Sequence, residues 1–382
     1  MRVTQSMLSN SNLKYISQNY NRLGSLQDQI NSGKKITKPS DDPVIAMKGM
    51  RFRSQVVEVE QFKRNLNEGF SWMDNSDSAL DEAGQVIQRI RELTVQASND
   101  SYDANARQNI SKEIDRLQEH LVALANSKVG DNYIFNGTDT SNAPINANQM
   151  NMDFTKFVDG LKTTPATSIP SDYVISYQGE TYKYNSGTTF KTNTGNTISI
   201  DLSTGAINHE YKEKLKYQDG QEATVKETIS SADLVLSKNT AVSTNTENVE
   251  IEVMKGVTIP INIRAQDAFS NDLFSGIESI KKMLNNPTTR GEDISKALDS
   301  LDGMMNNVVA TRAELGAQVN RTEMVQNRLL HQEVVAKKTV SDNEDIDFEK
   351  AIIDLTVQES IHRAALAMGA RIIQPTLMDF LR

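Results

Sequence analysis

Hydrophobic side chains recur along most of this chain at alternating steps of three and four residues. That spacing keeps them on one face of a helix. The pattern predicts helices over about 6–31, 43–98, 104–126, 270–284, 294–336 and 346–382. Two of these helices are too long to be covered by a compact core. They therefore predict an elongated bundle in which long helices pack along one another.

The closing helix stands apart because it has two apolar rows. One row contains Phe348, Ile352, Leu355, His362, Leu366 and Gly369, and the other contains Ile353, Val357, Ile361 and Met368. A helix with two apolar faces cannot bury both against a single neighbour. We therefore expect the end of the chain to lie between partners, as an assembly element would.

The first helix is the expected partner of the closing helix. Its apolar seam consists of Leu13, Ile16, Tyr20, Leu23 and Ile30. Lysine and arginine dominate the charges of the first segment, whereas aspartate and glutamate dominate those of the closing segment. Opposite charges favour pairing of the two ends. The alternative is a pair of separately solvated helices whose charges differ by chance.

The middle of the chain has a different pattern. From about residue 130 to 264 the sequence is rich in Thr, Asn, Ser and Gly, and its apolar residues alternate with period two. The alternation predicts strands around 173–177, 181–184, 198–202 and 257–263, the first two joined by a turn at Gln178-Gly179. The residues GDNYIFNGTDT, which begin at Gly130, predict a separate strand leading into a hairpin.

Together these patterns predict a mainly α, elongated fold. Its core is a long-helix coiled-coil bundle built from the N- and C-terminal segments, with a central β-rich domain inserted between them. The expected parts are a terminal helical domain (1–42 and 345–382), a long-helix domain with a β-hairpin (43–140 and 265–344), and a β-rich outer insert (141–264). The terminal helical domain is expected to order only on assembly.

Composition narrows the classes of function. Only 37% of the 382 residues are hydrophobic, which is less than the roughly 45–50% usual for globular chains. The formal net charge of −9 argues against nucleic acid as a partner, because phosphate binding needs a basic face. No apolar run reaches the roughly 18 residues of a membrane span, so we expect no membrane insertion.

Few residues are candidates for a catalytic or metal-binding site. The chain has no cysteine, and its histidines, His120, His209, His331 and His362, show no pair at metal-ligand spacing. Asp41 and Asp42 are adjacent carboxylates in a loop, but Asp42 is placed to cap a helix whose first residue is Pro43. We therefore predict no catalytic residue, no cofactor and no metal.

Four stretches resemble the flagellin superfamily: the first helix, the loop SGKKITKPSDDP (32–43), the segment YIFNGT (133–138) and the ending DFEKAIIDLTVQESIHRAALAMGARIIQPTLMDFLR (347–382). The loop, with PSDDP at 39–43, is similar to the form found in the hook-associated protein 3 branch, the hook–filament junction proteins. The resemblance covers about 1–140 and 267–382, and the insert has no part in it. Pro375 departs from the pattern and is expected to end the closing helix.

The resemblance implies a structural subunit without enzymatic activity, in which the first and last helices line the central export channel. It implies export through the flagellar type III apparatus to the extracellular flagellum. The implied partners are further copies of the chain in a ring, the first hook-associated protein, flagellin, and a cytoplasmic export chaperone on the C-terminal helix. The residues expected at assembly interfaces are Leu13, Ile16, Tyr20, Leu23 and Ile30 with Phe348, Ile352, Leu355, Ile361 and Leu366.

Alternatives to the junction role are open at this stage. The nearest is a flagellin, the subunit of the filament itself. A second is an exported adhesin or enzyme whose active part is the insert. A third is a phage-tail or other coiled-coil fibre protein.

Overall fold

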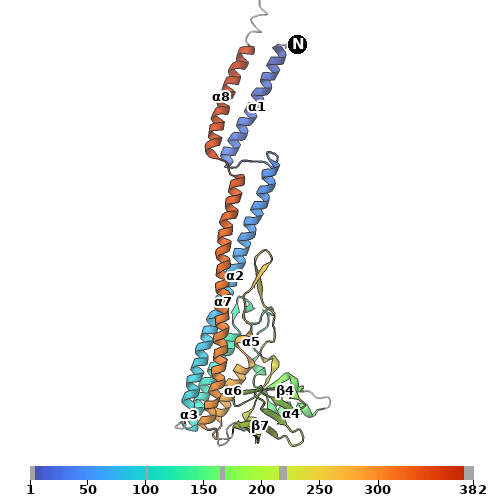
Figure 1. The fold of residues 1–382 in the computed structure, drawn as a ribbon, viewed down its shortest axis with the longest axis vertical. Helices are drawn as coiled ribbons and strands as arrows, with labels where there is room; N and C mark the ends of the chain where they lie inside the picture. Colours follow the sequence, from blue (N-terminus) through green and yellow to red (C-terminus); the bar gives the residue numbers. More distant parts are fainter. Residues whose placement is uncertain (1–4, 100–101, 164–167, 215–221, 374–382) are drawn as a thin grey trace, which may run out of the picture. The chain divides into compact units, whose positions relative to one another are not determined.

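The computed structural model describes residues 5–99, 102–163, 168–214 and 222–373 (Figure 1). The chain divides into two compact units. The first joins the two ends of the chain, Met1–Arg64 with Gln326–Arg382, and the second is Asn65–Val325. The two longest helices, α2 (Pro43–Ala97) and α7 (Gly291–Glu344), contribute residues to both units.

The first unit pairs the ends of the chain. Helices α1 (Gln5–Ser32) and α8 (Phe348–Ile373) lie side by side (Figure 1). The Gln358 amide donates to Asn19 Oδ1 at 3.1 Å, and the rings of Tyr20 and His362 lie 6.1 Å apart. The prediction that the first and closing helices pair is therefore confirmed. Pro375 and the rest of 374–382 lie outside the described residues.

The connection from α1 to α2 follows the local sequence rules. Gly33 has φ +70, a left-handed conformation that glycine adopts without strain, and α1 ends just before it. The Asp42 carboxylate accepts from the backbone N–H groups of Val44 at 2.9 Å and Ile45 at 3.1 Å, and Pro43 begins α2. The predicted cap is confirmed.

The second unit has a continuous helical core. Helices α3 (Ala104–Ala125), α5 (Ala265–Ala268) and α6 (Asn271–Asn285) pack with α2 and α7. Fully buried members of this core include Met73, Leu80, Ile87, Ile114, Phe135, Phe269, Phe274 and Leu315. Residues at alternating steps of three and four along α2 and α7 are buried or partly buried in this unit, for example Leu66, Phe70 and Met73 of α2 and Leu301, Met305 and Val308 of α7.

Polar residues within those seams form ion pairs. Arg312 of α7 bonds Asp77 of α2 at 2.8 Å and also contacts Asp81. Arg91 of α2 bonds Asp302 of α7 at 2.5 Å. A charged pair at a seam position favours one register between two long helices over its neighbours. These pairs therefore specify how α2 and α7 are aligned in this unit.

Two small hairpins accompany the helices. One is β1 (Lys128–Val129) with β2 (Asn132–Tyr133), in the predicted hairpin region. The other is β10 (Glu250–Met254) with β11 (Val257–Pro260), which lies close to Gly69 of α2. A side chain at Gly69 would meet Ile251 at 2.6 Å, so the glycine permits this close approach.

The insert is an antiparallel sheet with strand order β8-β7-β6-β5-β4-β3-β9. Its strands are β3 (Tyr173–Tyr177), β4 (Glu180–Ser186), β5 (Thr189–Lys191), β6 (Thr197–Ile200), β7 (Ile207–Lys214), β8 (Glu222–Ile229) and β9 (Val235–Lys238). Helix α4 (Phe154–Lys162) supplies Phe154, Phe157 and Val158 to the core of the sheet. The strands predicted at 173–177, 181–184 and 198–202 and the turn at Gln178-Gly179 are present in this sheet. The strand predicted at 257–263 is β11, which ends at Pro260 and pairs with β10 outside the sheet. Helix α4 and strands β5 and β7–β10 were not predicted.

Both the helical and the β-rich parts of the predicted fold class are thus present. Short 3-10 turns η1 (Ala147–Gln149), η2 (Pro170–Asp172), η3 (Ser231–Asp233) and η4 (Asn239–Ala241) connect elements of the insert. Within the described ranges, none of the helices combines the length and the apolar character that a membrane crossing demands.

Removing the centre of the insert core should destabilise the sheet. Phe190 of β5 is fully buried. It lies opposite Tyr184 on β4 and Ile198 on β6, the two neighbouring strands. We expect Phe190→Ala to cost about 3–5 kcal/mol, because it leaves a cavity that the sheet cannot fill. Hydrogen–deuterium exchange of peptides from β4 to β6 measures this loss.

The matched control is Lys191→Ala, the exposed neighbour on the same strand, which should stay within about 0.5 kcal/mol of the parent. Equal protection in the Phe190 variant and the parent would contradict the packing described here.

Candidate assembly surface

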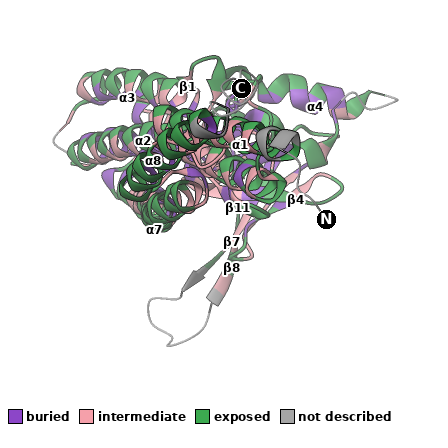
Figure 2. Ribbon diagram, turned by 90° about the horizontal axis from the view of Figure 1, so that it is seen from above, coloured by how far each residue is buried: buried purple, intermediate pink, exposed green. Residues whose placement is uncertain are grey.

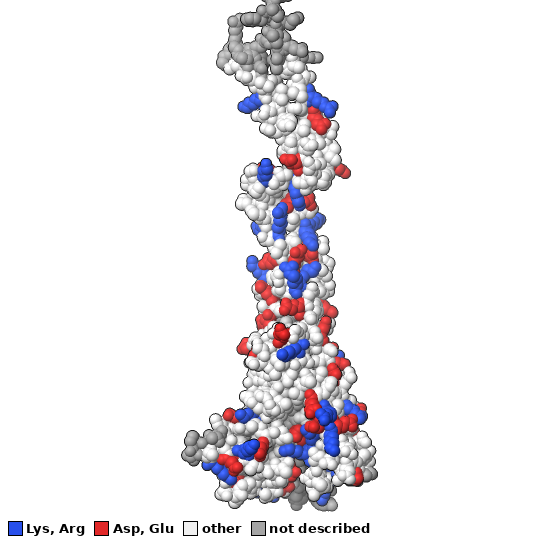
Figure 3. All heavy atoms as spheres, turned by 180° about the vertical axis from the view of Figure 1, so that it is seen from behind, with Lys and Arg blue, Asp and Glu red and all other residues white. Residues whose placement is uncertain are grey.

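The paired end helices expose large apolar side chains. Tyr20 of α1 is 67% exposed, and Ile353 of α8 is 63% exposed. Others with more than two-fifths of their surface exposed are Met7, Leu13, Tyr15, Phe348, Ile352, Val357, Ile361, Leu366 and Met368. Figure 2 shows α1 and α8 largely exposed, and Figure 3 shows few charged side chains on the face of this helix pair that it presents. Apolar surface of this extent marks a site of protein contact.

Small and polar residues of α8 are buried, and two of them, Gln358 and Gly369, contact α1. Ala351 is 4% exposed and Gln358 is 7% exposed, and Gly369 is buried with Ile16 lying over it. Small side chains let two helices approach closely, so the pairing of α1 with α8 leaves many of the larger apolar residues exposed. The row Ile353, Val357, Ile361 and Met368 of α8 is exposed throughout, whereas Leu355, His362 and Gly369 of the other row are buried or partly buried.

The residues predicted at assembly interfaces divide into two groups. Ile16, Leu23, Ile30 and Leu355 are partly buried within this unit. Leu13, Tyr20, Phe348, Ile352, Ile361 and Leu366 are exposed. The first group is thus partly covered within the chain, and the second group is left mostly exposed.

Ala351 and Gln358 were not predicted as contact residues. They share the four-three spacing with Leu355, His362 and Gly369, so the signal was present in the sequence. It was missed because the predicted seam was drawn through the largest side chains instead of the smallest.

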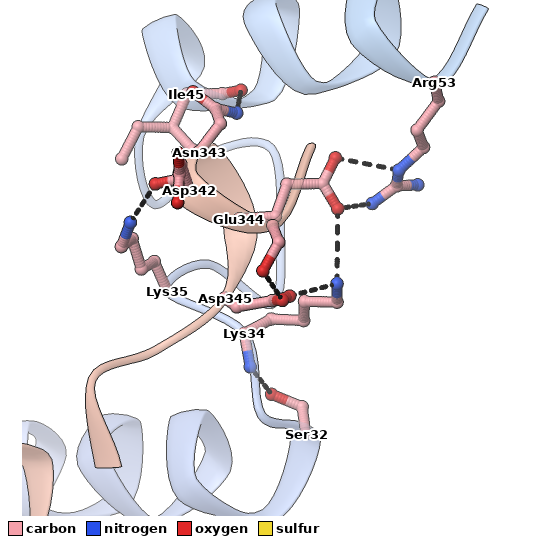
Figure 4. A network of polar contacts seen from close by, with 10 residues as sticks. Ser32, Lys34, Lys35, Ile45, Arg53, Asp342, Asn343, Glu344 and Asp345 are labelled. Carbon is pink, nitrogen blue, oxygen red and sulfur yellow. Dashed lines mark hydrogen bonds and ion pairs between the residues drawn. The ribbon is translucent and has the colours of Figure 1, made fainter. Parts of the chain in front are cut away.

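Hydrogen bonds and ion pairs join the segment between α1 and α2 to the segment between α7 and α8, and we call this contact the polar joint. Lys35 N–H donates to Glu344 C=O at 2.7 Å, and Ile346 N–H donates to Gly33 C=O at 3.0 Å. Figure 4 shows the side chains around these bonds. Lys34 Nζ lies 2.6 Å from Asp345 Oδ1, and the Asn343 amide donates to Ile45 C=O at 3.1 Å. These bonds therefore hold the segment after α1 against the segment before α8.

Glu344 is the centre of this joint. Its side chain is 5% exposed and accepts two bonds from Arg53, Nε to Oε1 at 2.8 Å and Nη2 to Oε2 at 2.6 Å (Figure 4). A second cation, Lys34, lies 3.5 Å from Oε2. A buried carboxylate needs such partners, because an unpaired buried charge is strongly destabilising.

Gly49 of α2 makes room for the Glu344 carboxylate. A Cβ at that position would lie 2.5 Å from Glu344 Oε1. The glycine therefore has a packing role on this helix, where glycine is otherwise unfavourable.

The ion pairs shift the pKa values of the joint in a consistent way. Hydrogen bonding from Arg53 lowers the pKa of Glu344, and hydrogen bonding from Lys34 lowers the pKa of Asp345. The same contacts raise the pKa values of Arg53 and Lys34. Both carboxylates are therefore ionised in the folded chain at neutral pH, and both cations are protonated.

The residue types most suggestive of chemistry gather inside the insert. The Tyr182 hydroxyl lies 2.8 Å from His209 Nε2, and His209 Nδ1 lies 2.9 Å from Glu227 Oε1. Tyr182 is only 1% exposed, and burial raises its pKa, so its hydroxyl is neither accessible nor activated. His209 is 5% exposed as well, so the bonded pair of Tyr182 and His209 lies inside the insert.

Acidification should loosen the joint. Because the folded-state pKa values of Glu344 and Asp345 are lowered, their contribution is complete above their ordinary values of 4.5 and 3.8 and is lost as pH falls through the folded-state values. We expect the amides of Lys35 and Ile346 to lose protection below about pH 4. Hydrogen exchange corrected for intrinsic rates measures this, with the Gly33 amide, bonded to Gln29 within α1, as the internal reference.

Glu344→Gln is the matched variant. It removes the charge but keeps the shape, so Lys35 and Ile346 should already be less protected at pH 7, and the dependence on pH should flatten. A variant with parental protection at both pH values would contradict the role given to Glu344.

Family models and relatives agree on the class of protein. The model of the bacterial flagellin N-terminal helical region matches residues 3–140, and that of the C-terminal helical region matches residues 298–381. Together the matched regions make up more than half of the chain. A flagellin of Clostridium tyrobutyricum is 22% identical, over 98% of this chain and all of that one. Flagellar hook-associated protein 3 of Escherichia coli is 21% identical, over 96% of this chain and 95% of its own length.

The solved structures point to the same fold. A chain described as a flagellar hook-associated protein from Vibrio parahaemolyticus superposes with a TM-score of 0.52 at 15% identity, and the match covers 80% of this chain and all of that chain. Both flagellin end regions are matched, in the expected order, on the helices that pair in the first unit. The chain therefore belongs to the flagellin family.

Proposed function

We propose that the chain is a structural subunit of the bacterial flagellum that forms the junction between hook and filament. The observation that carries this proposal is the set of large apolar side chains exposed on α1 and α8, in a chain whose ends match both flagellin end regions. Such surface is costly in water and is stabilised by burial against further subunits.

The mechanism is assembly by helix packing. Burying one exposed leucine or isoleucine contributes about 1.5–3 kcal/mol. Several such residues on each copy therefore favour association once copies are aligned, and the polar joint at Glu344 keeps α1 and α8 in register for it. In this proposal Leu13, Tyr20, Phe348, Ile352, Ile361 and Leu366 contact neighbouring subunits, while Ile16, Leu23, Ile30 and Leu355 hold the pair together.

The junction role is favoured over the filament role by the loop PSDDP (39–43) and by the ending PTLMDFLR (375–382), which resemble the junction branch. Similarity to a hook-associated protein over most of both chains supports the same choice. The alternative is a flagellin, which the similarity to flagellins over the whole length supports.

The proposal includes partners and location. Its partners are further copies in a ring, the first hook-associated protein, flagellin, and an export chaperone that covers the C-terminal helix before assembly. The chain would be exported through the flagellar type III apparatus and act outside the cell, without catalysis or a cofactor. We further propose that 1–42 with 345–382 form the assembly domain, that 43–140 with 265–344 form the long-helix domain, and that 141–264 form the outer insert.

Deletion of the gene separates the junction role from the filament role. A strain without it should keep its hooks and secrete unassembled flagellin, because flagellin would lack its starting layer. Electron microscopy of the cells and immunoblots of the medium measure both effects. A deletion strain that builds normal filaments would overturn the junction role.

A single polar substitution on the exposed face should impair assembly without unfolding the chain. Ile361 is 46% exposed, so Ile361→Gln should change the stability of the isolated chain by less than about 0.5 kcal/mol. It should lower the fraction of hooks that carry labelled protein, since a buried isoleucine is lost at each subunit contact.

Ala351→Gln is the contrasting variant. Ala351 of α8 is buried, so the larger side chain should destabilise the isolated chain by about 1–3 kcal/mol. If Ile361→Gln instead destabilised the isolated chain as much and left labelling unchanged, Ile361 would be a residue of the monomer fold.

A further inference from the structure

A pocket lies beside the polar joint. Its cavity volume is about 200 Å³. Apolar side chains of Ile36, Pro39, Ile45 and Met50 line it, and Lys34, Lys38, Arg53 and Glu344 stand at its polar side. A cavity of about 150 Å³ is enough to hold a benzene ring, so this pocket has room for one phenyl side chain.

The lining of the pocket holds three cations, Lys34, Lys38 and Arg53, and one carboxylate, Glu344. Arg53 and Lys34 are paired with Glu344 and Asp345. The Lys38 ammonium forms no ion pair within the described residues, although the Asp41 carboxylate lies nearby and accepts from the Lys38 backbone N–H at 2.9 Å. The first turns of α2 add Lys48 and Arg51, both exposed, and α2 has no acidic residue before Glu58. An occupant with an aromatic side chain flanked by carboxylates would match both the apolar lining and the charge.

The chain carries such an element at the start of α8. Phe348 is 51% exposed and does not line the pocket of its own chain. Asp347 and Glu349 flank it, and both are exposed. The α8 start is thus complementary to the pocket in shape and in sign of charge.

The pocket and Phe348 both lie next to the polar joint of the first unit. The bonds from Lys35 to Glu344 and from Ile346 to Gly33 join the pocket loop to the start of α8. Copies placed side by side would therefore present one element to the other. A contact between two different patches repeats from copy to copy and generates a ring or a helix.

We propose that the pocket of one subunit receives Phe348 of a second copy, with Asp347 and Glu349 of that copy beside Lys38. The proposal rests on the proposed function, because it specifies one contact within the assembly. The contact gives one member of the apolar rows, Phe348, a specific site on the next copy, and its charged groups make part of the assembly sensitive to salt.

Cysteine crosslinking tests this contact directly, since the chain has no cysteine of its own. Ala46 lines the pocket, so Ala46→Cys on one copy and Phe348→Cys on another should form a disulfide between subunits. Both single variants are produced in one strain, and isolated hook–filament complexes are run on non-reducing gels. We expect a covalent dimer only when both variants are present, and none when Ala46→Cys is replaced by Glu58→Cys, an exposed position elsewhere on α2.

Charge exchange gives an independent measurement. Lys38→Glu or Glu349→Lys alone should lower the amount of the protein in hook–filament complexes by about tenfold. The double variant Lys38→Glu/Glu349→Lys should recover most of it, because the two charges again have opposite sign. A merely structural role of either residue would give no recovery.

The outcomes separate this proposal from the proposed function. Complexes that contain both cysteine variants in normal amounts but form no dimer would overturn the Phe348 contact and leave the junction role intact. Absence of the parent protein from hook–filament complexes would overturn both.

Discussion

The dominant physical constraint in this protein is apolar surface that one chain cannot cover. Helices α1 and α8 meet through small and polar residues such as Gln358 and Gly369. Their large apolar side chains, Ile353 and Tyr20 among them, therefore face outward. Because burial of apolar surface is the main stabilising term in folding and association, this part of the chain gains stability from neighbours that it does not itself supply.

The second unit buries its apolar surface within the chain itself. Its long helices cover one another with α3 and α6, and the insert buries its aromatic residues between the sheet and α4. Arg312, Arg91 and their aspartate partners add alignment to that core. The second unit therefore buries its apolar residues within the chain, whereas the end helices leave theirs exposed for burial in an assembly.

The polar joint determines how the apolar rows of α1 and α8 are oriented. A self-assembling subunit has to present its apolar rows in a defined orientation, yet the segments between α1 and α2 and between α7 and α8 are irregular. Two backbone bonds and the buried Glu344, held by Arg53 and Lys34, tie those segments together. Buried ion pairs contribute more to a specific arrangement than to net stability, which is the role this position demands.

Much of the fold could be predicted from sequence because local physics determined it. The four-three spacing of apolar residues set the long helices, Gly33 and Asp42 set two of their ends, and alternation set strands such as β3 and β4. The charges and seams of the first and last helices were enough to predict that they pair. Strands β7 and β8 escaped prediction, because their charged side chains alternate on an exposed ribbon and few apolar positions mark them.

Only the tertiary structure decided which apolar row faces α1 and which faces outward. Sequence periodicity identifies the faces of α8, but several faces satisfied the same spacing, and the choice depended on how closely Gly369 lets α1 approach. The partners of Glu344, Arg53 and Lys34, lie about 300 positions away along the chain, so no local pattern could have paired them. The sequence by itself determined the helices, their caps and the apolar surplus at the chain ends, because these depend on neighbouring residues; packing between distant segments determined which surfaces remain for assembly.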